Sequence, residues 1–123
     1  ERRLGHLYLC DEALSTSGSG TQFFMHEGRR YGHILDPRSG WPAEGVLSAT
    51  AIAPTAARAE ALSTALYVLG PEAAQALCDQ QPGSGAILLC AGHRAGALTV
   101  HCLGRARQSW VESASIDSEA REA

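Results

Sequence analysis

The chain has 123 residues, of which 45% are hydrophobic and 19% charged, and its formal net charge is −3. This composition fits one globular domain with a core of its own. The basic residues are scattered and every apolar run is far shorter than the roughly 18–20 residues of a membrane span, so we expect no nucleic-acid partner and no direct membrane contact from this segment. In chain order, the first predicted element is a strand over residues 4–10, where apolar residues alternate loosely.

Small polar residues and turn formers dominate the next part of the chain. Residues 15–21, STSGSGT, predict a loop. Residues 22–35 then predict a hairpin, in which two β-rich arms flank Glu27 and Gly28. DPRSG at 36–40 has the residue order of a type I turn, with aspartate before proline and glycine at the end.

A strand predicted over residues 46–53 leads into two predicted helices. Thr55 is the expected N-cap of the first helix, which stops at Gly70 and Pro71. Pro71 opens a second, short helix over 71–80, because proline suits the first helical turn. Alanine is so frequent in the first helix that we expect this helix to be buried.

Two apolar strands over residues 86–90 and 97–103 complete the predicted fold, and the polar residues 112–123 are expected to form a frayed tail. The order strand, hairpin, strand, helix, helix, strand, strand predicts an α+β fold. We expect a mixed, mainly antiparallel sheet with two helices packed on one of its faces.

Two candidate places for chemistry lie in the first third of the chain. The glycines and hydroxyls of residues 15–21 could expose backbone N–H groups to an anion, but no Walker lysine follows, so a plain flexible loop is the favoured interpretation. His33 stands at a strand end that a proline-containing turn holds. It could present a ring nitrogen for acid–base work, or simply bond a neighbouring carbonyl. In that second interpretation Asp36 serves the turn and Arg38 is a solvated charge.

The third candidate place is one face of the first predicted helix. Glu60 and Thr64 lie four positions apart and share that face, with Ser63 adjacent. A carboxylate and a hydroxyl on a buried helix need a partner. Oxygen donors of this kind suit Mg²⁺, which takes one or two carboxylates and completes its octahedron with water and phosphate oxygens. In the alternative, Thr64 bonds the carbonyl four residues back and Glu60 points to solvent.

In their order and spacing, STSGSG at 15–20, HILDPRSG at 33–40 and EALSTALYVLG at 60–70 resemble the C-terminal part of the ApbE family of FAD:protein FMN transferases. Members of that family carry a TSG loop, a hairpin that ends in HIIDPRTG, and a helix that reads roughly DALATALFVLG. The resemblance implies that residues 1–123 are either a single domain or the C-terminal part of a larger flavin transferase. We expect such a part to be inactive on its own.

The activity that the resemblance implies is Mg²⁺-dependent transfer of FMN from FAD to a threonine or serine hydroxyl of an acceptor flavoprotein, with release of AMP. His33 is then the implied catalytic residue, which helps to activate the acceptor hydroxyl. Glu60 and Thr64 are the implied ligands of Mg²⁺, and Ser63 is close enough to contribute. The implied flavin-site residues are Ser17, Gly18, His33, Ile34 and Asp36.

Two other hypotheses stay open. Most members of the family have aspartate where this chain has Glu60, and Mg²⁺ demands near-ideal geometry. The chain could therefore be a divergent module that binds FAD, or hydrolyses it slowly, without transferring FMN. A third hypothesis is a structural domain that retains only the fold. The sequence does not fix the compartment, and the resemblance suggests a bacterial periplasmic or membrane-associated location.

Overall fold

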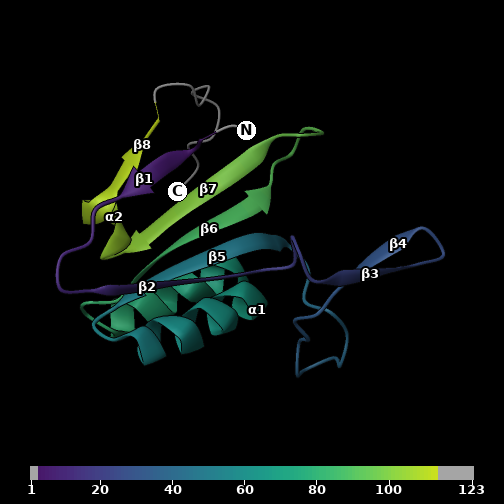
Figure 1. Cartoon of the computed structure of the whole chain (residues 1–123), viewed down its shortest axis with the longest axis horizontal. Coiled ribbons are helices and arrows are strands. Elements are labelled where there is room, and N and C mark those ends of the chain that lie inside the picture. Colours follow the sequence, from purple (N-terminus) through teal and green to yellow (C-terminus); the bar gives the residue numbers. More distant parts are fainter. Residues whose placement is uncertain (1–2, 114–123) are drawn as a thin grey trace.

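A four-stranded antiparallel sheet forms the centre of the fold, in the order β2-β5-β6-β7 (Figure 1). The computed structural model describes residues 3–113. The strands of this sheet are β2 (Ala13–Gly18), β5 (Val46–Ala53), β6 (Gly85–Ala91) and β7 (Leu98–Gly104). The bounds of β5 are those predicted from the sequence, and β6 and β7 each begin or end within one residue of their predicted limits.

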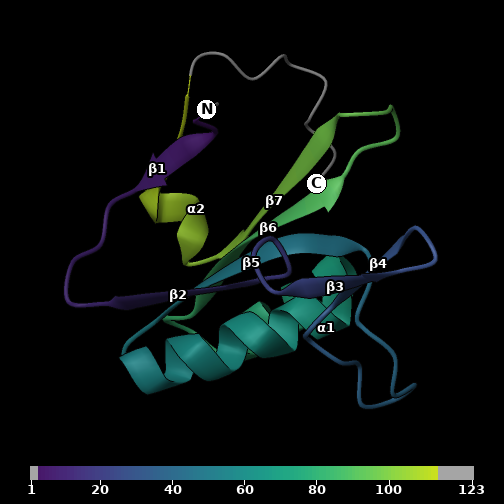
Figure 2. The same cartoon turned by 45° about the vertical axis from the view of Figure 1, so that its right-hand side comes forward.

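One face of the sheet is covered by the helix α1 (Ala56–Gln80), which lies below the sheet in Figures 1 and 2. Leu66 and Tyr67 of the helix are buried in one apolar cluster with Ala49, Ala51 and Leu88 of the sheet. Alanine side chains on β5 let the helix backbone approach closely, and close packing of this kind is what makes the core cohesive. The predicted burial of the helix is confirmed for the side that faces the sheet.

The two predicted helices are two segments of α1 that meet at a break. Thr55 is the N-cap, as predicted, and its hydroxyl accepts a hydrogen bond from the Arg58 N–H. Gly70 has φ 82° and ψ 174°, which interrupts the helix, and Pro71 follows it. Proline has no N–H to donate and suits only the first turn of a helix, so the second segment starts where the sequence placed it.

The opposite face of the sheet carries a second apolar cluster, centred on Ile52, Ile87 and Ala106. It is covered by a short helix that was not predicted and by a two-stranded sheet of which only the first strand was predicted. These are α2 (Ala106–Ser109) and the pair formed by β1 (Gly5–Leu7) and β8 (Trp110–Glu112). The predicted strand at 4–10 is therefore shorter than expected.

The predicted frayed tail begins too early. Glu112 belongs to β8 and pairs with Gly5, and the Ser113 N–H donates to the Leu4 carbonyl. The physical reason is the pairing itself, since backbone groups of a polar segment are satisfied once a partner strand lies beside them. Residues 114–123 of the predicted tail lie outside the described residues.

The predicted hairpin is confirmed as β3 (Phe23–His26) and β4 (Arg29–Gly32), which extends past the end of the central sheet (Figure 1). Glu27 and Gly28 both have positive φ, as a two-residue turn of the type favoured in hairpins requires. Phe24 and Tyr31 stack across the two strands with their ring centroids 5.1 Å apart. Such a pair stabilises a hairpin whose side chains are otherwise largely exposed.

The prediction of a loop at residues 15–21 was wrong for its first part. Ser15 to Gly18 lie in β2, which pairs with β5 over six consecutive positions, from Ala13 opposite Ala53 to Gly18 opposite Ser48. Small polar residues have weak strand propensity of their own, and pairing with a buried neighbouring strand overrides it. This correction matters most for the site, because a strand fixes the direction of each side chain.

The predicted α+β class is confirmed, with an antiparallel central sheet and the segments of α1 on one face. No helix in the described part of the chain is long and apolar enough to cross a membrane.

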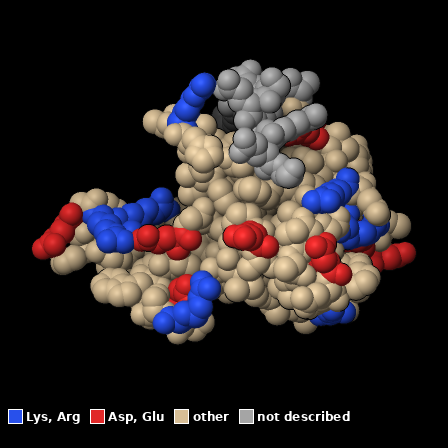
Figure 3. Space-filling view, turned by 180° about the vertical axis from the view of Figure 1, so that it is seen from behind, with Lys and Arg blue, Asp and Glu red and all other residues tan. Residues whose placement is uncertain are grey.

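Figure 3 shows acidic and basic side chains interspersed over one side of the molecule. Ion pairs among the described residues include those of Arg29 with Glu44 and of Arg38 with Asp36.

Candidate functional site

Alternate residues of β2 point toward α1. Ser15 and Ser17 pair with Ala51 and Ala49, whose side chains belong to the core beneath the helix. Because side chains alternate between the two faces of a strand, both serine hydroxyls face the same helix. The intervening Thr16 lies on the other face, where its hydroxyl is 2.8 Å from that of Thr50.

A chain of hydroxyl groups joins β2 to the middle of α1. Ser17 Oγ lies 2.8 Å from Ser63 Oγ and 3.0 Å from Thr64 Oγ1. Ser63 is fully buried and donates to the Glu60 carbonyl at 3.0 Å. Each hydroxyl has a single proton, so Ser63 accepts from Ser17 in this arrangement and Ser17 accepts from Thr64. The lone pairs of Thr64 are then left for another partner.

Glu60 lies one turn earlier on the same helix and its carboxylate contacts the same strand. Ser15 Oγ donates to Glu60 Oε2. Glu60 therefore does not simply point to solvent, although the residue is exposed. Thr64 contacts Ser17 and not the carbonyl four residues back, whereas Ser63 is the residue that bonds a helix carbonyl. The helical spacing of Glu60 and Thr64 thus places a carboxylate and a hydroxyl side by side, as the sequence predicted.

His33 follows the last residue of β4 and its ring is oriented by the hairpin. Its Nδ1 lies 3.0 Å from the Gln22 carbonyl oxygen. A carbonyl oxygen can only accept, so Nδ1 carries the proton and Nε2 of the neutral ring has a free lone pair. The structure thus shows the bond to a neighbouring carbonyl that the second interpretation predicted. This bond is compatible with Nε2 acting as a base, and that role stays a prediction.

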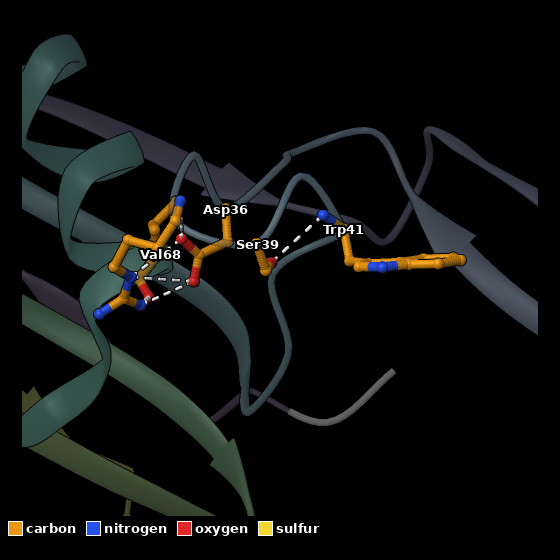
Figure 4. A network of polar contacts seen from close by, with 5 residues as sticks. Asp36, Ser39, Trp41 and Val68 are labelled. Atoms are coloured by element: carbon orange, nitrogen blue, oxygen red, sulfur yellow. Dashed lines mark hydrogen bonds and ion pairs between the residues drawn. The ribbon is translucent and has the colours of Figure 1, made fainter.

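The turn after His33 is built around Asp36 (Figure 4). The Asp36 carbonyl accepts from the Ser39 and Gly40 N–H groups, and its carboxylate accepts from the Arg38 N–H and guanidinium. The hydrogen bonds from Arg38 hold the pKa of the Asp36 carboxyl below its usual value. Arg38 also donates to the Val68 carbonyl at 3.4 Å, which ties the turn to α1 just before its break.

One pocket of about 500 Å³ brings most of the predicted site together. Of the residues predicted from the sequence it is lined by Ser17, Gly18, His33, Ile34, Glu60 and Thr64. Asp36 and Ser63 do not line it, since Asp36 is engaged in its turn and Ser63 is buried behind Ser17. Four further residues line the pocket and were not among the predicted site residues: Thr16, Thr21, Gln22 and Leu35. Thr16 and Leu35 directly adjoin predicted site residues, which was the available signal, whereas Thr21 and Gln22 adjoin none of them.

The oxygen atoms that line this pocket are of the chemical type that binds a hard cation. Glu60 supplies one carboxylate, and Thr64 supplies a hydroxyl with free lone pairs. Mg²⁺ is usually held by one or two carboxylates, with water and substrate phosphate completing its shell. No group of three or more histidine, cysteine, aspartate or glutamate side chains gathers within the described residues. Glu60 and Thr64 are thus the oxygen ligands that the described part of this pocket offers to such a cation.

A family model matches residues 2–88 and is described as the ApbE family. The chain belongs to the ApbE family. Its curated relatives include the FAD:protein FMN transferase of Escherichia coli strain K12, which is 48% identical over 63 residues, covering 50% of this chain and 18% of that protein. The FAD:protein FMN transferase of Treponema pallidum is 42% identical over 80 residues, covering 64% of this chain and 22% of that protein.

Solved ApbE structures share the fold. An ApbE protein from Thermotoga maritima superposes with a TM-score of 0.67 at 33% identity, over 83% of this chain and 32% of that one. The apo flavinyl transferase ApbE of Pseudomonas stutzeri gives a TM-score of 0.64 at 37% identity, over 81% of this chain and 31% of that one. The chain thus spans about a fifth to a third of the length of these ApbE proteins. The family predicted from the three motifs is confirmed.

Proposed function

We propose that this chain contributes a reaction site that transfers FMN from FAD to a threonine or serine hydroxyl of an acceptor flavoprotein, with release of AMP. The observation that carries the proposal is that His33 lines the same pocket as Glu60 and Thr64. A base and a pair of oxygen ligands are what a phosphoryl-type transfer to a hydroxyl needs. Relatives named FAD:protein FMN transferase support the choice of reaction.

In the proposed reaction the acceptor hydroxyl oxygen attacks the phosphorus atom on the FMN side of the pyrophosphate. A new phosphorus–oxygen bond forms to the acceptor, and the bond between that phosphorus and the bridging oxygen breaks. The hydroxyl proton passes to His33 Nε2, and AMP leaves with the bridging oxygen. The Gln22 carbonyl stabilises the resulting imidazolium because it already accepts a hydrogen bond from Nδ1.

Glu60 and Thr64 would hold Mg²⁺ beside the pyrophosphate. When bound, the cation supplies neutralisation of the negative charge on the phosphate oxygens. Ser17 orients the Thr64 hydroxyl through its 3.0 Å contact. The resemblance implied Ser63 as a further ligand. In the proposed site it would instead hold the Ser17 hydroxyl in place through their 2.8 Å contact.

The proposal is tested with the protein at its full natural length, FAD and an acceptor flavoprotein, by following flavin fluorescence of the denatured acceptor and its increase in mass. We expect labelling with Mg²⁺, none with EDTA, and a loss of about 100-fold or more in Glu60→Ala at low Mg²⁺. Glu72→Ala, an exposed carboxylate on the same helix that does not line the pocket, is the matched control.

Two results would contradict the proposal. Undiminished labelling in EDTA and in Glu60→Ala would show that the reaction does not depend on a bound cation. FAD cleavage to FMN and AMP without any labelling of acceptors would favour instead the module that hydrolyses FAD without transferring FMN.

A further inference from the structure

We infer that Ser15 is a positioning residue for the Glu60 carboxylate, an assignment that rests on the proposed function of the pocket. In a loop, which the sequence predicts for residues 15–21, the Ser15 side chain would have no fixed direction. In the structure it lies in β2, directly over α1. Its hydroxyl donates to Glu60 Oε2 across 45 positions of sequence.

The contact leaves one carboxylate oxygen engaged and the other available. Among the described residues, Ser15 is the source of the only side-chain hydrogen bond to the Glu60 carboxylate, and the bond goes to Oε2. Ser15 is half-buried, while Glu60 is exposed and lines the pocket. A glutamate in that position would otherwise sample several rotamers in solvent, because its side chain has three rotatable bonds.

The arrangement explains how a glutamate can serve at a position that demands accurate placement. Mg²⁺ requires near-ideal octahedral geometry, so a freely rotating carboxylate makes a poor ligand. A hydrogen bond from a strand restricts the carboxylate to a small set of positions before any cation arrives. Partners of metal ligands that act in this way typically change metal affinity by about 10–100-fold when they are removed.

Ser15 also belongs to a repeated pattern between β2 and α1. Ser15 contacts Glu60, and two residues later Ser17 contacts Thr64, one helical turn further on. Ser63 Oγ also lies 3.5 Å from Ser15 Oγ, so the two cross-links are adjacent to one another. The two candidate cation ligands of the helix are thus each held by a serine on the same face of one strand.

The experiment measures cation binding rather than turnover. Mn²⁺ is titrated into the full-length protein with FAD and without acceptor, and free Mn²⁺ is followed by its electron paramagnetic resonance signal. We expect Ser15→Ala to raise the dissociation constant by about 10-fold or more. Ser15→Thr keeps the hydroxyl on a strand-favouring residue and should bind within about 3-fold of the unsubstituted protein. Thr50→Val removes a hydroxyl from a hydroxyl–hydroxyl contact on the other face of the sheet, and should leave binding unchanged.

A double-mutant cycle separates positioning from general loss of structure. In the Glu60→Ala background, Ser15→Ala should add less than about 2-fold, because its partner is gone. Equal effects of Ser15→Ala in both backgrounds would overturn the inference. If Glu60→Ala weakens Mn²⁺ binding and Ser15→Ala does not, only the role of Ser15 fails. If Glu60→Ala leaves binding unchanged, the proposed cation site and the role of Ser15 fail together.

Discussion

Ser17 on β2 and Thr64 on α1 are 47 positions apart in sequence, yet their side-chain oxygens lie 3.0 Å apart. The contact exists because STSG is a strand and not a loop, so that its second serine faces the helix. It places a hydroxyl of the helix at the edge of a pocket that also contains His33. Strand pairing with β5 and packing of α1 on the same face of the sheet together produce the site.

His33 is predicted to be the base for transfer. His33→Ala should reduce labelling of the acceptor by about 100-fold or more while FAD binding persists, because a positioned general base contributes on that scale. Labelling rates are measured by in-gel flavin fluorescence and FAD binding by calorimetry. His26→Ala is the control, since this exposed histidine is on the same hairpin and does not line the pocket. Full activity of His33→Ala would rule out the assignment.

Ser17 and Ser63 are predicted to be energetically coupled. Each of Ser17→Ala and Ser63→Ala should lower the free energy of unfolding by about 1 kcal/mol or more, because the remaining hydroxyl is buried and loses a partner. The double variant should lose about 0.5–1.5 kcal/mol less than the sum of the single variants. Urea unfolding followed by circular dichroism measures all four proteins. Strict additivity would show that the 2.8 Å contact contributes nothing.

Gly70 is predicted to be required at the break in α1. Its φ of 82° with ψ of 174° belongs to a region that residues with a β-carbon avoid. Gly70→Ala should therefore lower the free energy of unfolding by about 1–3 kcal/mol, although nothing lies within 4 Å of the added carbon. Gly20→Ala, which also adds its carbon to open space, serves as the comparison in the same urea titration. Equal stability of both variants would argue against backbone strain as the cause.

Asp36 is predicted to make stability depend on pH in the acid range. Its pKa is lowered in the folded protein by hydrogen bonds from Arg38. A lowered folded pKa contributes stability that is fully present above the unfolded value, about 3.9, and is lost as the pH falls through the folded value. Stability measured by urea unfolding should thus fall below about pH 4. The fall should be smaller in Asp36→Asn and in Arg38→Gln, and an identical fall in Arg38→Gln would contradict the stated cause.

Local sequence signals were sufficient for several elements. The turn at Glu27 and Gly28, the N-cap at Thr55 and the break at Gly70 each depend on conformational preferences of the residues themselves. β2 could not be found in this way, because its small polar residues become a strand only beside β5. The pairing of β1 with β8 likewise joins residues about a hundred positions apart, which no local pattern encodes.

The residues of the candidate site likewise divide into those that local sequence signals identify and those that only the fold reveals. Glu60 and Thr64 could be paired from helical spacing, and His33 could be placed at a strand end. Asp36 and Ser63 were grouped with them by resemblance, yet one belongs to a turn and the other is buried behind the pocket. Ser15 could not be identified from the sequence, because its role depends on the direction in which β2 points its side chain.

The alternation of side chains along β2 has a consequence for how the length of this chain can vary. Removing Thr16, or adding one residue between Ser15 and Ser17, would place the two serines on opposite faces of the strand, so that only one of them could face the helix. At the tip of the hairpin, Glu27 and Gly28 do not line the pocket, so added residues there would leave the site intact. Homologous chains that keep the activity should therefore differ in length at the hairpin tip and share a fixed residue count along this strand.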